Sequence, residues 1–378
     1  MGARIAVYGA SGYTGSLVAR ELRRRGHAPV LAGRSAKRLR ALADELGGEA
    51  EVRTAAVDDL DALRHAIGDA DTVINCAGPF VRHGEPVVRA AVQTGTHYVD
   101  TTGEQPFIQR VFERHDDAAR AAEVAVVPAL GFDYAPGDLI CRLAARGHEP
   151  LRELVVAYAV SRLEPTRGTL RSALEMMKGG DVVYEEGGWR PAGSTPLRAR
   201  FPFPSPVGTQ PVARYPAGEV VTVPRHTRTR RVTAVITAST FLPIAPLGPG
   251  LPIALPVVAL ALRTPLRAMI SHAIGRLPAG PGEEARRRSR FTVVARAIGE
   301  DGRVGEAEVH GSDVYGITAK SVVHGALLLA EGAHTGSGAL APAAAFDPVA
   351  FLNFLTGHGL SYEIGASPVG SPQRRSPV

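Results

Sequence analysis

The feature that most constrains the fold of this chain is a glycine-rich turn close to its beginning. Arg4–Tyr8 predicts a strand, the turn Gly9–Gly15 (Gly-Ala-Ser-Gly-Tyr-Thr-Gly) follows directly, and a helical pattern runs from about Gly12 to Arg25. Glycines between a strand and a helix allow a tight bend, a close approach of the backbone to a ligand, and close packing of helix on strand. The spacing therefore predicts an anion-binding loop at a helix N-terminus.

The rest of the first third alternates strands with helices. Apolar runs at 29–32, 51–55, 72–76, 97–100 and 124–130 predict strands, and helical patterns separate them. Such alternation is typical of an α/β Rossmann fold with a doubly wound parallel sheet. Because the glycine turn stands between the first strand and the first helix, we favour a dinucleotide-binding loop over a glycine turn without a ligand.

The end of the second strand indicates which dinucleotide is bound. An enzyme that uses NAD usually carries Asp or Glu there to hold the ribose 2′-hydroxyl, whereas this chain has Gly33-Arg34-Ser35. A charge-assisted hydrogen bond contributes about 1.5–3 kcal/mol, which is roughly ten- to hundredfold in affinity. We therefore expect NADP(H), although Arg34 could also be a solvated residue at a helix start. The expected cofactor residues, including the turn after the fourth strand, are Gly9, Ser11, Gly12, Tyr13, Thr14, Gly15, Arg34, Ser35, Asn75, Ala77, Gly78 and Pro79.

The pattern changes after residue 133. Alternating apolar residues near 154–160 and a hairpin signal at Asp301-Gly302 predict a second, α+β domain on a mostly antiparallel sheet. We expect a Rossmann domain at 1–133 and, at 134–312, a domain that binds the substrate and forms a homodimer contact. We expect helices at 313–366 that pack back on the first domain, and a disordered tail at 367–378.

Composition excludes several classes of protein. The chain has 378 residues, of which 45% are hydrophobic and 21% charged, as in ordinary globular proteins. Its net charge of +6 comes without a basic patch interleaved with aromatic residues, so we expect no nucleic-acid partner. Cys76 and Cys141 provide neither a disulfide framework nor metal-ligand spacing, so we expect no metal. Without a signal peptide, a reducing, cytoplasmic location is expected.

Residues 232–262 contain no charged side chain. Repeated prolines interrupt this stretch, and each interior proline costs a helix about 3 kcal/mol, so a membrane span is disfavoured. Two interpretations stay open. The stretch is a core strand, an apolar loop and a packed helix that starts near Pro256, or it is a lid that admits a lipid substrate or contacts a membrane surface. We favour the first, because exposed apolar patches of that size are uncommon.

The motifs together resemble a known family, the saccharopine dehydrogenase-like oxidoreductases, and within it the subgroup called trans-acting enoyl reductases. The resemblance is dense over 1–145 and thinner beyond. It is carried by Gly9–Gly15, Ala32–Arg34, Val73–Phe80, Tyr98–Glu104, Gly131–Asp138, Gly168–Ala173, Tyr315–Gly332 and Ala341–Ala343. It implies a nicotinamide cofactor, a Rossmann domain and a mixed α/β second domain. The subgroup implies reduction of a carbon–carbon double bond in a hydrophobic lipid or polyketide intermediate.

The resemblance provides no matched catalytic motif. Reduction of an enoyl group needs a hydride and a proton donor, and Tyr134 and Tyr98 are the phenols best placed by sequence, with His97 as a weaker candidate. Asp133 and Asp138 are equally compatible with a structural and a functional role. An amino-acid oxidoreductase of the saccharopine type and a regulator that binds NADP without turnover remain alternatives.

Overall fold

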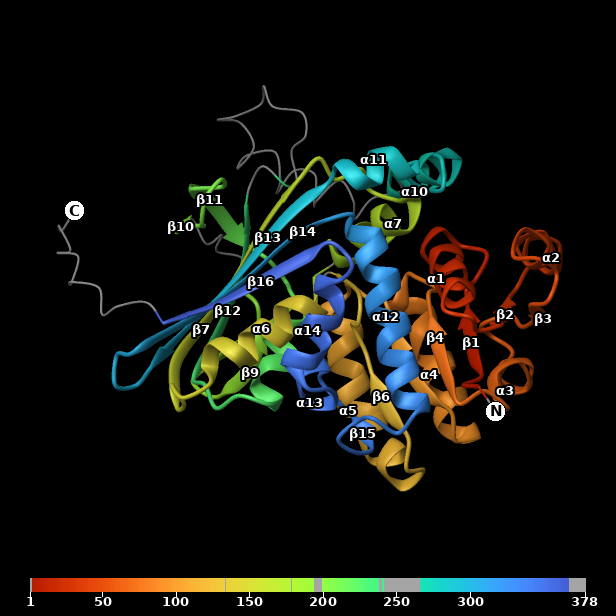
Figure 1. The fold of residues 1–378 in the computed structure, drawn as a ribbon, viewed down its shortest axis with the longest axis horizontal. Helices are drawn as coiled ribbons and strands as arrows, with labels where there is room; N and C mark the ends of the chain where they lie inside the picture. Colours follow the sequence, from red (N-terminus) through yellow and green to blue (C-terminus); the bar gives the residue numbers. More distant parts are fainter. Residues whose placement is uncertain are drawn as a thin grey trace.

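The computed structural model describes residues 2–132, 134–177, 179–193, 199–237, 240 and 266–366. These residues form two sheets, with helix α12 (Val314–Ala330) between them (Figure 1). The expected fold class, a Rossmann sheet followed by an α+β domain, is confirmed. One hydrophobic core extends from Ile5 in the first sheet to Leu360 in the second, so the two parts are packed together.

The first sheet is parallel, with the strand order β15-β6-β5-β4-β1-β2-β3. Its inner strands are short and mostly buried because helices cover both faces, and Ile5, Ala6 and Val7 of β1 are fully buried. Its strands are β1 (Ile5–Tyr8), β2 (Val30–Gly33), β3 (Glu51–Thr54), β4 (Thr72–Asn75), β5 (His97–Asp100), β6 (Ala125–Val127) and β15 (Gly338–Ala339). The connecting helices are α1 (Tyr13–Arg24), α2 (Ala36–Glu45), α3 (Leu60–Ile67), α4 (Phe80–Thr94) and α5 (Gln105–Ala121).

The second sheet has nine strands, with the order β10-β11-β12-β7-β13-β14-β16, β8 beside β12 and β9 beside β8. Neighbouring strands of this sheet run antiparallel, except that β12 runs parallel to β7. The strands are β7 (Leu151–Ser161), β8 (Val182–Glu185), β9 (Gly188–Pro191), β10 (Ala199–Pro202), β11 (Thr209–Arg214), β12 (Arg231–Thr237), β13 (Arg290–Gly299), β14 (Val304–Ser312) and β16 (Leu360–Ala366). The expected hairpin at Asp301-Gly302 joins β13 to β14, and Gly302 has the positive φ of 83° that this turn requires.

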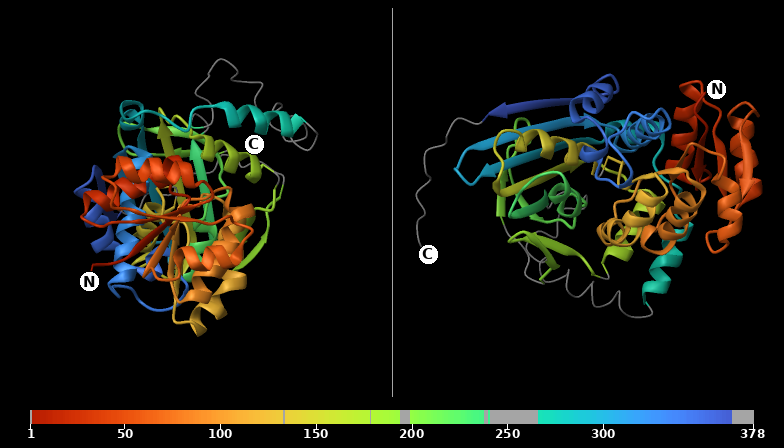
Figure 2. Two further views of the ribbon diagram at one scale, coloured as in Figure 1. Left: turned by 90° about the vertical axis from the view of Figure 1, so that its right-hand side faces the viewer. Right: turned by 90° about the horizontal axis from the view of Figure 1, so that it is seen from below.

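The remaining helices cover the second sheet or bridge the two sheets. Helix α6 (Ala135–Ala145) packs on β13 and β14, and α12 packs on α1, β4 and β5. Helices α7 (Arg167–Met176), α10 (Leu266–Arg276) and α11 (Glu283–Arg288) lie at one end of the molecule, near α1 (Figures 1 and 2). Four further elements complete the described fold, namely α8 (Glu219–Thr222), η1 (Val223–Arg225), α13 (Pro342–Ala345) and α14 (Pro348–Thr356).

Four expectations fall wholly or partly on residues that the structure does not describe. Of the apolar stretch 232–262, residues 232–237 belong to β12, and residues 241–262 lie outside the described residues. The helix expected from Pro256 is described only from Leu266 onward, as α10. The tail at 367–378 and Asp133 also lie outside. Within the described ranges, no helix combines the length and apolar character needed to cross a bilayer.

Candidate cofactor cleft

The turn between β1 and α1 is built so closely that side chains would not fit. A Cβ atom on Gly15 would lie 2.3 Å from the Gly9 carbonyl oxygen, and one on Gly9, whose φ is +79°, would lie 2.9 Å from the Ala77 nitrogen. Gly12 is the N-cap of α1 and provides no side-chain acceptor, so the N–H groups of the first helical turn remain for a ligand. This geometry fits a pyrophosphate.

A cleft lies at this turn, between the edge of the first sheet and helix α7. All the predicted cofactor residues line it except Gly15 and Asn75. Gly15 instead allows α1 to pack closely on the turn. Asn75 accepts a hydrogen bond from the Ala77 nitrogen at 3.0 Å and thereby holds the turn after β4. The described lining residues on the opposite wall come from the second part of the chain, namely Thr166, Arg167, Gly168, Arg171, Leu174, Glu175, Ser271 and Ala279.

One end of the cleft is strongly basic. Arg34 and Arg38, at the start of α2, line it together with Arg82 and His83 from the first turn of α4. Arg82 forms an ion pair with Glu175 at 2.9 Å, whereas neither Arg34 nor Arg38 forms an ion pair within the described part of the chain. Arg34 is exposed and free to meet a ligand. The residues present therefore fit NADP(H), with the phosphate loop for the pyrophosphate and Arg34 for the 2′-phosphate.

Two polar contacts connect helix α7 to the start of α4. The Ser172 hydroxyl donates to the fully buried Glu104 carboxylate at 2.6 Å, and that carboxylate also accepts from the Phe80 and Val81 nitrogens at 2.9 and 2.8 Å. The Arg82–Glu175 ion pair is the second contact. Glu104 thus caps α4 and anchors the opposite wall of the cleft. The sequence placed Glu104 at a strand end and did not indicate this role, because the helix that it caps begins earlier in the chain.

Tyr13 joins the phosphate loop to the far part of the chain. Its hydroxyl donates to the Pro281 carbonyl at 2.8 Å, and its ring meets that of Tyr315 edge to face at 5.4 Å. A Cβ atom on Gly280 would lie 2.6 Å from the Tyr13 ring, so the segment passes directly over it. The side chain of Tyr13 therefore joins the two parts of the chain.

The structure places both predicted proton donors away from the cleft lining. The Tyr98 hydroxyl donates to Asp100 at 2.8 Å and accepts from Asn75 at 3.1 Å, and burial raises the pKa of Tyr98 well above its ordinary value. The Tyr134 hydroxyl donates to the Gly103 carbonyl at 2.8 Å. Both side chains are fully buried. His97 accepts from the Ala125 nitrogen at the start of β5, at the opposite edge of the sheet.

The surroundings of two further polar residues, Cys76 and Asp138, indicate structural roles. Cys76 lines the cleft, but burial raises the pKa of its thiol to about 12, so it is not a thiolate nucleophile at neutral pH. The Asp138 carboxylate is fully buried and accepts from Thr222, His226 and Ala343 at 2.6–3.0 Å, which ties α6 to its neighbours. Among the residues described, no group of three His, Cys, Asp or Glu side chains could hold a metal.

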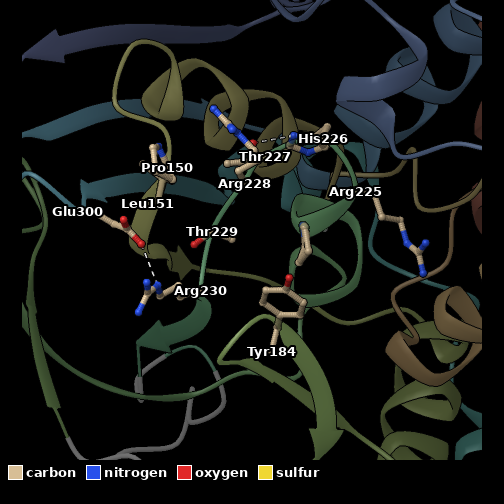
Figure 3. Close-up of a pocket in the computed structure, with 11 residues that line it drawn as sticks. Pro150, Leu151, Tyr184, Arg225, His226, Thr227, Arg228, Thr229, Arg230 and Glu300 are labelled. Carbon is tan, nitrogen blue, oxygen red and sulfur yellow. Dashed lines mark hydrogen bonds and ion pairs between the residues drawn. The ribbon is translucent and has the colours of Figure 1, made fainter.

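A second hollow lies at the beginnings of β7 and β12 (Figure 3). Three of its charged or titratable lining residues have partners within the protein, since Arg230 pairs with Glu300 at 2.8 Å and His226 contacts Thr227 and Asp138. Arg225 extends away from the hollow in Figure 3, and its guanidinium lies 3.8 Å from the centroid of the Phe112 ring. The hollow has none of the features of the cofactor cleft.

Comparisons with known proteins agree with the geometry of the cleft. Residues 5–127 match the family model of the saccharopine dehydrogenase NADP binding domain. A trans-acting enoyl reductase of Mycobacterium leprae is 37% identical over 140 residues, which are 36% of this chain and 34% of that protein. A homologue with the same name in Mycobacterium ulcerans is 33% identical over 204 residues, 52% of this chain and 47% of that protein. The matches thus span less than half the length of these relatives.

One solved structure matches nearly the whole fold. Saccharopine dehydrogenase (L-Glu forming) from Saccharomyces cerevisiae superposes with a TM-score of 0.59 and 15% identity, over 97% of this chain and 100% of that chain. At this identity the likeness shows the fold alone. The match of the first domain, in contrast, rests on its sequence and on the phosphate loop described above. Residues 5–127 therefore match the saccharopine dehydrogenase NADP binding domain in sequence, and the resemblance to the saccharopine dehydrogenase-like oxidoreductases is confirmed.

Proposed function

We propose that this protein is an NADPH-dependent reductase of a carbon–carbon double bond in a hydrophobic lipid or polyketide intermediate. The observation that carries the proposal is the cleft itself, where the phosphate loop and Arg34 form one wall and α7 forms the other. The names of the mycobacterial relatives support the enoyl substrate. Bound there, NADPH supplies a hydride, and the protein contributes orientation and exclusion of water.

The charges of the cleft argue against a saccharopine-type amino-acid substrate. Such a substrate carries an ammonium group, which needs a carboxylate partner when it leaves water. Glu175 is the one carboxylate among the described lining residues, and it is already bound to Arg82 at 2.9 Å. The remaining charged side chains of the described lining are basic. These basic side chains suit the carboxylates of such a substrate, so the conflict concerns its ammonium group, which an uncharged enoyl group lacks.

Selection of NADPH over NADH is assigned to Arg34. Arg34→Ala removes a charge-assisted bond to the 2′-phosphate, so we expect NADPH to bind about tenfold or more weakly and NADH to be unaffected. Arg40→Ala is the matched control, because Arg40 is exposed on the same helix and does not line the cleft. Isothermal titration calorimetry measures both cofactors. An equal loss for NADPH and NADH would contradict the assignment.

Turnover separates a reductase from a regulator that only binds NADP. Purified protein is mixed with NADPH and a panel of enoyl thioesters and unsaturated lipids, and absorbance at 340 nm follows the cofactor. Deuterium from one of the two stereoisomers, (4R)- or (4S)-[4-²H]NADPH, must then appear on the β carbon of the product. Amino acids with 2-oxo acid partners serve as the competing panel. If NADPH binds tightly but is not oxidised with either panel of substrates, a regulator that binds NADP without turnover is favoured.

We also propose contact with a lipid surface. Met269 and Leu277 of the α10 region are 69% and 45% exposed, and His272 and Arg276 line a hollow beside the cleft. A relative of Caenorhabditis elegans, 37% identical over 146 residues, is named a lipid droplet localized protein. In a flotation assay the protein should rise with anionic liposomes, and Met269→Asp should reduce the fraction of protein that rises with them. Equal behaviour with and without liposomes would contradict contact with a lipid surface.

A further inference from the structure

His83 stands at the basic end of the cleft without an assigned role. It lies in the first turn of α4, is half-buried, and lines the cleft together with Arg34, Ser35 and Arg38. Its imidazole forms no hydrogen bond with the other described residues, although its neighbour Arg82 is held by Glu175. Its ring is therefore available to whatever enters this end of the cleft.

The charged side chains that line the cleft together with His83 come from three elements. Arg82 lies on the same helix α4, Arg34 and Arg38 lie at the start of α2, and Arg167, Arg171 and Glu175 lie on α7. Burial, together with Arg82 and Arg34, lowers the pKa of His83, and Glu175 raises it by a smaller amount. The imidazole is accordingly neutral near pH 7 when no anion is present. A dianion bound among these groups would instead favour protonation of the His83 imidazole, because an opposite charge within ~4–6 Å favours the protonated form.

We propose that His83 is a specificity-determining residue that binds the 2′-phosphate of NADP(H) as an imidazolium, so that NADP(H) binding takes up a proton and tightens as the pH falls. The proposal rests on the placement of the 2′-phosphate at Arg34. It deepens that assignment, because Arg34 provides a charge at every pH, whereas His83 provides one only when protonated. NADH lacks the 2′-phosphate, and its affinity gains nothing from protonation of His83.

The direction of the pH effect follows from linkage. The imidazole binds its proton more tightly in the complex than in the free protein, so affinity rises between the two pKa values as the pH decreases. A phosphomonoester has its second pKa near ~6, so the dianion persists above that pH. Between pH 8.0 and 6.5 we expect the Kd of NADPH to fall by about three- to tenfold and the Kd of NADH to stay constant.

The experiment is isothermal titration calorimetry of NADPH and NADH with the full chain at pH 6.5, 7.2 and 8.0. Each titration is repeated in two buffers that differ in ionisation enthalpy, which gives the number of protons taken up. We compare the wild type with His83→Gln and His83→Lys, and with His65→Gln, an exposed histidine of α3, as the control. Glutamine should abolish proton uptake and the pH dependence for NADPH. Lysine should give tight binding at each of these pH values.

The outcomes separate this proposal from the function itself. If no variant binds either dinucleotide, the assignment of the cleft fails. If NADH and NADPH bind but His83→Gln retains the proton uptake of the wild type, His83 has no part in recognition and the present proposal is wrong. The proposal is equally wrong if the wild type shows the same pH dependence for both cofactors.

Discussion

Replacement of Glu104 by glutamine should loosen the wall of the cleft and destabilise the fold. The carboxylate accepts three hydrogen bonds, from the Phe80 and Val81 nitrogens and from the Ser172 hydroxyl. A glutamine of the same shape keeps one acceptor oxygen and turns an amide NH₂ group toward one of the helix N–H groups. One buried donor at the start of α4 then has no acceptor.

The size of the effect follows from these contacts. A buried donor left without a partner costs ~1–3 kcal/mol, and loss of a negative charge at a helix N-terminus adds ~0.3–1 kcal/mol. Burial raises the pKa of Glu104, so removal of its charge recovers part of the loss. The net expectation is a decrease of about 2 kcal/mol in the free energy of unfolding. Ser172→Ala removes a single donor and should cost about 1 kcal/mol.

Urea unfolding of the wild type, Glu104→Gln, Ser172→Ala and the double variant measures these values. Because both variants break one shared contact, the double variant should lose less than the sum, with a coupling of ~0.5 kcal/mol or more. Glu85→Gln is the control, because Glu85 is a partly exposed carboxylate of α4 that forms surface ion pairs. This substitution should lower the free energy of unfolding by less than about 0.5 kcal/mol. The reasoning is refuted if Glu104→Gln is as stable as Glu85→Gln.

Three further outcomes follow from the structure. Gly15→Ala places a Cβ atom 2.3 Å from the Gly9 carbonyl oxygen, so calorimetry should show loss of NADPH binding and a lower melting temperature, whereas unchanged binding would contradict the geometry of the loop. Burial lowers the pKa of His324 from 6.5 to about 4, so the unfolded chain binds the proton first as the pH falls from 6.5 to 4, and stability declines over that range. His324→Phe should reduce this decline by ~1–3 kcal/mol in urea unfolding at pH 4.5 relative to pH 7, and an unchanged decline would show that other groups cause it. Cys76, whose thiol pKa is about 12, should react with iodoacetamide at pH 8 far more slowly than free cysteine, and rapid labelling in mass spectra would show that the thiol is accessible and ionised.

Local patterns are enough to predict most of the first sheet and one wall of the cleft. The turn Gly9–Gly15 and the residue Arg34 can be recognised from a few neighbouring positions, because the strand, the loop and the helix are consecutive in the sequence. The hairpin between β13 and β14 is predictable for the same reason, from Asp301-Gly302. The glycine turn and the hairpin depend on local backbone conformation, because glycine permits the positive φ values that they require, as at Gly9 and Gly302.

The second wall of the cleft could not be predicted, because it depends on contacts between distant segments. Ser172 and Glu104 meet across 68 positions of the chain, and a capping pattern is visible in sequence only within about three residues. The parallel pairing of β12 with β7 and the short strand Gly338–Ala339 have no local signal either. The sequence favours Tyr98 and Tyr134 as proton donors because Tyr98 lies in the fifth strand and Tyr134 follows the sixth, but burial of each hydroxyl depends on packing around it.

The packing of α12 and β15 on the first sheet means that the cofactor domain is not contiguous in the sequence. During synthesis, residues 2–130 leave the ribosome long before Val314–Ala330 can cover β4 and β5, so the apolar face that α12 later protects is exposed in the nascent chain. An excised N-terminal fragment would retain that exposed face and would also lack Pro281 and Tyr315, which both contact Tyr13. Expression of the first domain alone should therefore produce aggregation, and co-expression with residues 266–366 should reduce it.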